Sequence, residues 1–425
     1  MEFYNPSEKI KLMRKKFRVN QAELEGLNMT RAFISMMESG KRTVSKASSK
    51  ALAEKFNNIA KRISVNLDLD DEYFSRTPKE DARFYCEEQL KKELDFNQLQ
   101  ELIKIAKEFE LDDLLAQVYK VLGDKRYKKK EYVEAALYLR KALGKFKELR
   151  DDKSQIKVYF SLGLCKRNNG EYEDAIQYFE DSITYALDER DMKTYYKSNV
   201  NIATTYCQLN EFDKCLYIID NSILNHSSEI EFEILCFAKI TKATVLYKLE
   251  EYEGALKEFF NLVDLVNGKD DSNLAKIYND IAECYYSLGE YDNSLKYIEK
   301  SQQVTLKIDK ASLPYTLNTK GKILFKNNLY SESILILNLA IDIAEQYKNI
   351  DALLQSYKDL VKVYESKQDY TSITKVMNKL LETLDNFDTS LGRSYAMLKL
   401  TEASVHLDDK EEAVSLLNKL ENLMV

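Results

Sequence analysis

Asparagine, lysine and arginine side chains recur at corresponding places along this chain, and together they could bind an extended peptide. A carboxamide carries both a hydrogen-bond donor and an acceptor, which is what an unpaired peptide unit of a main chain needs. A lysine or arginine can bind a carboxylate, including a free C-terminus. The candidate peptide-binding residues are Lys157, Arg167, Lys197, Asn201, Gln208, Lys276, Asn279, Tyr315, Asn318 and Lys322. The alternative is that they are solvated residues in a chain where Asn is common.

The sequence carries no pattern typical of an enzyme. Its two histidines, His226 and His406, lie far apart, and there is no Gly-rich phosphate loop and no HExxH or GxSxG motif. The six cysteines form no CxxC pair, and several fall on packing positions of the repeat described next. We therefore expect no catalysis, no cofactor and no metal, and reduced core thiols rather than disulfides.

A motif with a period of about 40 residues must position the candidate side chains. It reads GEYEDAIQYF or GEYDNSLKYI in clear copies, and its small-residue positions are Ala135, Ala175, Cys215, Ala255, Ser294, Ser333, Ile373 and Ala413, which lie 39 or 40 residues apart. Twelve residues earlier there is often another small residue, such as Gly163, and four residues later a large apolar one, such as Phe179. We expect two helices per copy that cross closely at the paired small residues.

This pattern resembles the tetratricopeptide repeat, whose consensus is about 34 residues long. The extra residues would lengthen the helices by roughly a turn and a half. The resemblance implies an all-α chain in which helix pairs stack into a right-handed superhelical array with a concave face that binds peptides. In such repeats the second, fifth, sixth, ninth and twelfth or thirteenth positions of the first helix face inward, and these positions select the candidate residues above.

The head of the chain differs from the body in charge. Residues 1–65 contain 14 Lys and Arg against 6 Asp and Glu, a net charge of +8, whereas residues 66–425 contain 49 against 64, a net charge of −15. A basic head favours a polyanionic partner, and the acidic body does not.

The head also has the pattern of short helices joined by a tight turn. Residues 7–17, 21–27 and 30–42 are predicted to be helical, with Ser7 and Thr30 as N-caps and Gly40 as a helix end. In the last of these helices the inward-facing residues are expected to be Phe33, Ile34 and Met37, and the outward-facing ones Arg31, Ala32 and Ser35.

Over residues 7–65 this order resembles the helix-turn-helix domain of Xre/Cro-type repressors. The residues that carry the resemblance are Arg14, Gln21, Leu24, Ile34, Ser35, Glu38, Gly40, Lys41 and Arg42. The resemblance implies that Gln21, Lys41 and Arg42 hold phosphates, that Thr30, Arg31 and Ser35 approach bases, and that Arg14 pairs with Glu38 inside the domain. The turn is one residue shorter than in most phage repressors, with Asn28 and Met29 in place of the usual Gly.

The domain order follows from these patterns. We expect a DNA-binding domain at 1–66, a linker at 67–78 that ends near Pro78, and a repeat domain of eight to nine helix pairs at 79–425, with an irregular first pair at 79–117. A head joined to such an array resembles the family of peptide-pheromone receptors that includes Rap, Rgg, NprR, PlcR and PrgX, with a layout closest to NprR and PlcR.

The family resemblance implies a quorum-sensing transcription regulator that binds a short signalling peptide in its concave groove and double-stranded operator DNA through its head, as a homodimer or a higher homo-oligomer. The alternative is a Rap-like protein that binds a response regulator and inhibits or dephosphorylates it; a third is a plain scaffold. With no long apolar run and no signal peptide, we expect a cytoplasmic protein with no membrane partner.

Overall fold

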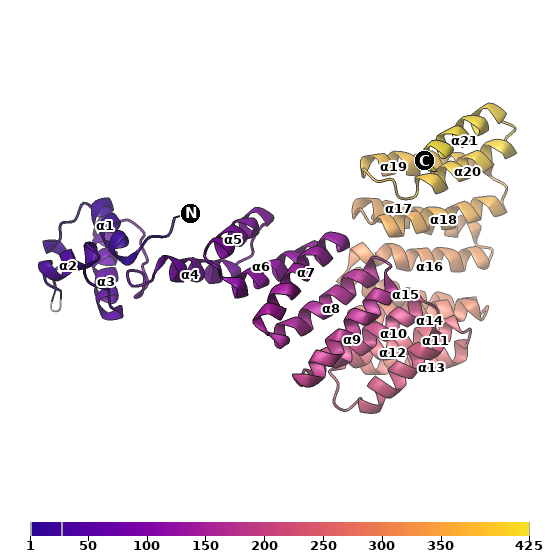
Figure 1. Ribbon diagram of the computed structural model, residues 1–425. Coiled ribbons are helices and arrows are strands. Elements are labelled where there is room, and N and C mark those ends of the chain that lie inside the picture. Colours follow the sequence, from indigo (N-terminus) through magenta and orange to yellow (C-terminus); the bar gives the residue numbers. More distant parts are fainter. Residues whose placement is uncertain (1, 27–28, 425) are drawn as a thin grey trace. The chain divides into compact units, whose positions relative to one another are not determined.

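The computed structural model describes residues 2–26 and 29–424, and these residues are all-helical, with no strand among them (Figure 1). The chain forms two compact units, Met1–Asn201 and Ile202–Val425. The predicted all-α class is confirmed. None of the helices in the described ranges is long and apolar enough to span a membrane.

The first unit begins with four elements, which we call the head: α1 (Pro6–Phe17), a 3-10 turn (Ala22–Leu24), α2 (Arg31–Glu38) and α3 (Lys46–Arg62). Thr30 caps α2 as predicted, because its hydroxyl accepts a hydrogen bond from the Phe33 N–H at 3.3 Å. The N-cap of α1 is Asn5 rather than Ser7, because Pro6, which fits the first helical position, follows it.

Two predicted helices of the head are shorter in the structure. Within 21–26, only the 3-10 turn forms, because the Gly26 and Met29 backbones exchange hydrogen bonds of 3.0 and 3.1 Å instead of continuing a helix. Leu27 and Asn28 lie outside the described residues. The helix predicted over 30–42 ends at Glu38, because Gly40 takes the left-handed conformation with φ +71°.

The head has its own hydrophobic core. Ile34 and Met37 of α2 are fully buried, as predicted, and pack with Ile10 of α1 and Phe56 of α3. Phe33 is half-buried. Phe74, from the segment predicted as a linker, is also fully buried in this core.

A buried ammonium joins α1 to the segment that follows the head. Lys9 is 2% exposed, and its Nζ donates to the carbonyls of Tyr73 and Arg76 at 2.8 Å each and pairs with Asp81 on α4 (Pro78–Leu90). Helix α4 begins where the sequence predicted, with Thr77 as its N-cap.

Helix pairs then follow one another to the end of the chain. The first unit continues with α5 (Phe96–Glu108), α6 (Asp112–Lys128), α7 (Tyr132–Leu149), α8 (Asp152–Asn168), α9 (Tyr172–Asp188) and the first part of α10 (Met192–Gln208). The second unit contains the rest of α10, α11 (Phe212–Ile218) with a π turn (Ile219–Ile223) and a 3-10 turn (Leu224–His226), α12 (Phe232–Lys248), α13 (Tyr252–Val266), α14 (Asp271–Ser287), α15 (Tyr291–Ile308), a 3-10 turn (Lys310–Ser312), α16 (Leu313–Lys326), α17 (Tyr330–Gln346), α18 (Ile350–Ser366), α19 (Tyr370–Asn386), α20 (Arg393–His406) and α21 (Lys410–Met424). Pairs α4/α5 and α6/α7 correspond to the predicted irregular pair and first regular copy.

The two helices of a pair cross where the small residues meet, as the motif predicted. A Cβ built on Gly163 of α8 would lie 2.6 Å from the ring of Phe179 on α9, and one on Gly321 of α16 would lie 2.6 Å from Leu337 on α17. Where the second small residue is Ser333, its hydroxyl donates to the Gly321 carbonyl at 2.8 Å. Hydrogen is therefore the largest side chain that fits at these glycines without movement of a neighbour.

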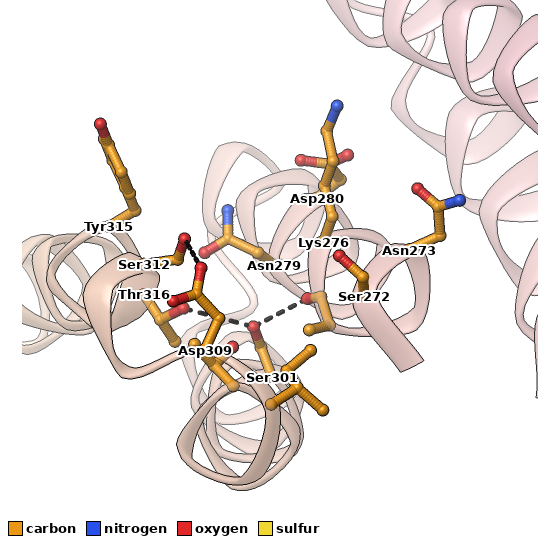
Figure 2. A pocket seen from close by; sticks show the side chains of 13 residues that line it. Ser272, Asn273, Lys276, Asn279, Asp280, Ser301, Asp309, Ser312, Tyr315 and Thr316 are labelled. Atoms are coloured by element: carbon orange, nitrogen blue, oxygen red, sulfur yellow. Dashed lines mark hydrogen bonds between the residues drawn. The ribbon is translucent and has the colours of Figure 1, made fainter. Parts of the chain in front are cut away.

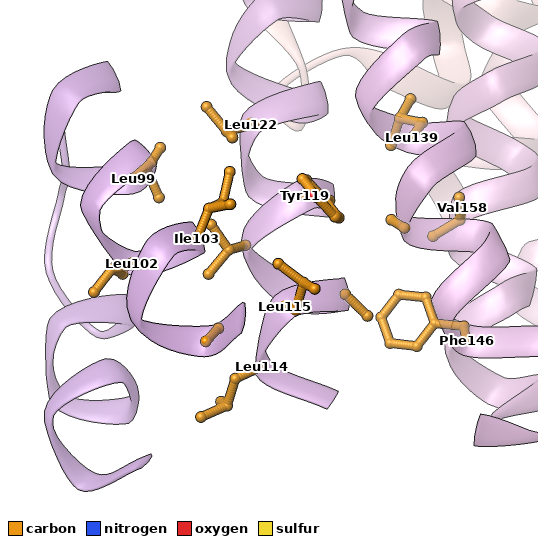
Figure 3. Packing of buried hydrophobic residues seen from close by; sticks show 14 of the residues in the cluster. Leu99, Leu102, Ile103, Leu114, Leu115, Tyr119, Leu122, Leu139, Phe146 and Val158 are labelled. Carbon is orange, nitrogen blue, oxygen red and sulfur yellow. The ribbon is translucent and has the colours of Figure 1, made fainter. Parts of the chain in front are cut away.

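Apolar side chains from successive helices fill the space between pairs. In the first unit, Leu99 and Ile103 of α5, Leu115 of α6, Phe146 of α7 and Val158 of α8 belong to one continuous cluster (Figure 3). All six cysteines are buried. Each helix pair thus buries its apolar face against its neighbours within a unit.

The close crossing predicts opposite effects for two glycine substitutions. Gly163→Ala should lower the free energy of unfolding by roughly 1–3 kcal/mol, because the new methyl group overlaps the Phe179 ring. Gly144→Ala on α7 is the control, since a Cβ there meets no atom within 4 Å, and it should raise that free energy by up to about 1 kcal/mol. Urea unfolding followed by circular dichroism measures both, and equal changes would contradict the crossing geometry.

Candidate functional site

The exposed face of α2 presents several of the residues predicted to contact DNA. Because Ile34 and Met37 face the core, Arg31 and Ser35, one turn apart, are both exposed. Thr30 is exposed at the start of the helix, and Lys41 and Arg42 are exposed after its end. The Arg42 guanidinium lies 4.3 Å from the centre of the Phe33 ring.

Behind this face, a polar cluster ties α1 to α2. The predicted pair of Arg14 and Glu38 is confirmed, with 2.6 Å between Arg14 Nε and Glu38 Oε1. Gln21 joins it, since its Nε2 donates to Glu38 Oε2 at 2.6 Å. The Gln21 amide, which the resemblance assigns to phosphate, thus donates to Glu38 in this structure. Arg14 and Glu38 have a structural role, because their ion pair joins α1 to α2.

In the first unit, the candidate peptide-binding residues contact one another. Arg167 of α8 donates from Nη1 to Asn201 Oδ1 at 2.6 Å, and Asn201 Nδ2 donates to the carbonyl of Lys197 at 2.7 Å. Burial lowers the pKa of Arg167. Lys157 is exposed on α8. Both ends of the Asn201 carboxamide are therefore used inside the protein.

In the second unit, three of the predicted residues line one cavity of about 410 Å³, which we call the α14–α16 cavity (Figure 2). It lies between α14, the end of α15 and the start of α16, and most of its lining residues have polar side chains. The lining residues are Ser272, Asn273, Ala275, Lys276, Asn279, Asp280, Ser301, Thr305, Ile308, Asp309, Ser312, Tyr315 and Thr316. Its volume falls in the range of small-ligand sites, roughly 300–1,000 Å³.

Two adjacent residues of this cavity have unused hydrogen-bonding capacity. The Oδ1 atom of Asn279 is buried and has no hydrogen-bond partner among the described residues. Asp280 makes no hydrogen bond or ion pair with any described residue, and burial raises the pKa of its carboxyl to about 7; the Lys276 ammonium opposes that rise and Glu283 adds to it. Buried polar atoms are normally paired, so the unpaired Asn279 oxygen, beside the half-buried Asp280 at a cavity, indicates a place for a ligand.

The remaining candidates of the second unit have different surroundings. Gln208 is exposed near the end of α10. Lys322 lines a second cavity of about 260 Å³ but pairs with Glu283 at 2.7 Å, and although burial would lower the pKa of Lys322, this carboxylate raises it. Asn318 is 3% exposed and its Nδ2 lies 3.4 Å from the Ala352 carbonyl of α18, so it lies between helices rather than on an open surface.

Sequence reasoning did not single out Asp280. The signal was present, because Asp280 is at the sixth repeat position when Ala282, the counterpart of Gly163, is counted as the eighth; this position is expected to face inward, and Asp280 follows Asn279 directly. What the sequence could not show is that Asp280 forms no salt bridge with a described residue, although the Lys276 ammonium is near enough to lower the pKa of its carboxyl. The contribution of Asp309 and Ser312, from the loop between α15 and α16, was also missed.

Comparisons with known proteins agree with this architecture. The tetratricopeptide repeat matches residues 156–189 and 275–306, which correspond to the α8/α9 and α14/α15 pairs. The array is tetratricopeptide-like. No curated protein matches the chain in sequence.

Solved structures of low sequence identity share the fold. A signal transduction ATPase with numerous domains and a tetratricopeptide repeat sensor, from Pyrococcus horikoshii, is 13% identical over 99% of this chain and 72% of its own, with a TM-score of 0.55. The apo quorum sensor NprR from B. thuringiensis is 18% identical over 82% of this chain and 99% of its own, with a TM-score of 0.51. A Rap protein complexed with competence and sporulation factor is 13% identical over 98% of each chain, but its TM-score of 0.38 is too low to support an argument. At these identities the likeness shows the fold alone.

The partners of the asparagines predict different effects on stability. Asn201→Ala should lower the free energy of unfolding by roughly 1–3 kcal/mol, because the half-buried Arg167 loses an acceptor. Asn279→Ala should leave it unchanged or raise it slightly, because the substitution removes a buried oxygen that has no partner among the described residues. Urea unfolding of the two variants beside the wild type is the measurement, and a larger loss for Asn279→Ala would show that this side chain supports the fold.

Proposed function

We propose that this protein is a cytoplasmic, peptide-gated regulator whose repeat array binds a short signalling peptide and whose head binds operator DNA. The observation that carries the proposal is the α14–α16 cavity, where the Asn279 oxygen and the Asp280 carboxyl have no partner among the described residues and lie on the first helix of a repeat pair. An extended peptide would supply the missing donors from its main chain or side chains.

The likeness to NprR supports the same proposal. That protein is a quorum sensor whose structure shares its fold with most of this chain. The α14–α16 cavity is a separate ground for the proposal, because side chains at inward positions of the repeat line this cavity. A regulator of this kind would bind a peptide without a cofactor or catalysis, in keeping with the absence of enzyme motifs from the sequence.

The charge and the exposed face of the head support DNA as the second partner. The head carries a net charge of +8, and Arg31, Ser35, Lys41 and Arg42 are exposed on and after α2. A short helix of this kind can enter the major groove while lysines after it contact phosphates. In a homodimer, a peptide that binds one conformation of the array more tightly would favour that conformation. The spacing of the two heads on the two half-sites of an operator would then change.

DNA binding by the full-length chain should depend on salt and on two residues in different ways. Arg31→Ala should reduce discrimination between operator and random duplex by roughly 1–3 kcal/mol, because it removes a contact to bases. Lys41→Ala should weaken binding to both duplexes and flatten the salt dependence, because it removes a phosphate contact. Fluorescence anisotropy with the gene's own upstream DNA tests both. Absence of any salt-dependent binding, together with a stable complex with a response regulator, would favour the Rap-like alternative.

Peptide binding should require Asn279 more than Asn201. Calorimetry with short secreted peptides encoded beside the gene should give measurable binding, and Asn279→Ala should weaken it by roughly 1–3 kcal/mol without lowering the melting temperature. Asn201 is already bonded inside the protein, so any loss of affinity in Asn201→Ala should accompany a loss of stability. Full affinity in Asn279→Ala would place the peptide elsewhere.

A further inference from the structure

We propose that the α14–α16 cavity binds a cationic group of the ligand, an ammonium or a guanidinium, with Asp280 as its counter-ion. This inference rests on the proposed peptide-binding function and adds the chemistry of the peptide that would be recognised. The residues that carry it are Asp280, Asn279 and the hydroxyl groups around them.

Several hydrogen-bond acceptors line the cavity. The Asn279 oxygen has no partner among the described residues, and Asp280 forms no hydrogen bond or salt bridge with any of them. The Ser301 hydroxyl donates to the Ala275 carbonyl at 2.8 Å, so its oxygen can still accept a hydrogen bond. Thr316, whose hydroxyl lies 3.5 Å from that of Ser301, adds another oxygen. An ammonium or guanidinium carries several donors and no acceptor, so it complements this set.

Two helix starts near the cavity, where a carboxylate could bind, are already capped by the chain. The N-terminus of α14 is capped by Asp270, which accepts from the Asn273 N–H at 3.0 Å. The turn that leads into α16 is capped by Asp309, which accepts from the Ala311 N–H at 3.0 Å. Because these helix starts hold the protein's own carboxylates, their affinity for an anionic ligand is reduced.

The charges around Asp280 leave it without a fixed counter-ion. Lys276 and Glu283 on α14 lie near it with opposite charges, and Asp309 lines the same cavity from the loop after α15; from α16, Tyr315 donates its hydroxyl to Asn349 at 3.1 Å. Lys276 is exposed and forms no ion pair with Asp280. By contrast, Glu283 is paired with Lys322. A cation of the ligand could therefore pair with Asp280 in the way that Lys322 pairs with Glu283.

The first experiment is an affinity selection with the full-length protein. Wild type and Asp280→Asn are incubated at pH 8 with a synthetic library of unmodified hexapeptides, and retained peptides are identified by mass spectrometry. Peptides with Lys or Arg should be enriched by the wild type and lose about tenfold or more in affinity for the variant. Asp264→Asn, the same change at an exposed residue of α13, should behave as the wild type. N-acetylation of the retained peptides distinguishes a side-chain cation from the N-terminal ammonium.

The second measurement is the pH dependence of affinity for a retained basic peptide. Since burial raises the pKa of Asp280 to about 7, its carboxyl must lose a proton to act as a counter-ion, so affinity should rise as the pH increases from 6 to 8. In Asp280→Asn, affinity should stay constant across this range. Asp280→Glu, which keeps the charge, should retain the pH dependence.

The outcomes separate this inference from the proposed function. Retention of no peptide by the wild type would overturn the proposed function. Retention of peptides without enrichment of basic residues, or with enrichment of acidic ones held by Lys276, would overturn the cation site alone. Circular dichroism melting of Asp280→Asn identifies a variant that fails to fold, and Asp280→Glu then provides the deciding comparison.

Discussion

The close crossing of two helices at a glycine is the constraint on which the rest of this structure depends. At Gly163 and Gly321 the facing side chain, Phe179 or Leu337, occupies the space where a Cβ would lie. The contact fixes the distance and the angle between the helices of a pair. A closer approach would make the facing side chain overlap the glycine backbone, and a larger separation would lose packing. Copies of the same contact every 39 or 40 residues explain how the chain repeats one geometry.

Within each unit, this geometry places the first helices of successive pairs close enough for side chains to bridge them. Arg167 reaches Asn201, Tyr315 reaches Asn349, and Glu365 reaches Lys399 at 2.8 Å, each across 34 residues of sequence. These bridges use side chains that would otherwise be available to a ligand. A polar residue at an inward position is therefore a candidate for binding only where no such bridge satisfies it.

The α14–α16 cavity is a place where this condition is met. Asn279 and Asp280 share α14 with Glu283, yet Glu283 pairs with Lys322 and is hydrogen-bonded by Thr319 at 3.0 Å, while the Asn279 oxygen and the Asp280 carboxyl have no partner among the described residues. The difference follows from position along the helix: Glu283 lies one turn further on, opposite the middle of α16, whereas Asn279 and Asp280 border the space left at the start of α16.

The sequence by itself determined the all-α class, the period, the close crossing at small residues and the burial of Ile34 and Met37, because each depends on residue size and spacing along one helix or one pair. The resemblance to Xre/Cro-type repressors implied the pairing of Arg14 with Glu38, which the structure contains. The helix predicted over 21–27 was too long, because backbone pairing of Gly26 with Met29 decides the conformation there. The tertiary structure alone decided which asparagines can still accept a hydrogen bond. Asn201, Asn279 and Asn318 have the same side chain at inward positions, yet Asn201 accepts from Arg167 on another helix, whereas the Asn279 and Asn318 oxygens have no partner among the described residues. Asn279 borders a cavity, while Asn318 lies between helices and donates to the Ala352 carbonyl, and this difference depends on packing that no local pattern records.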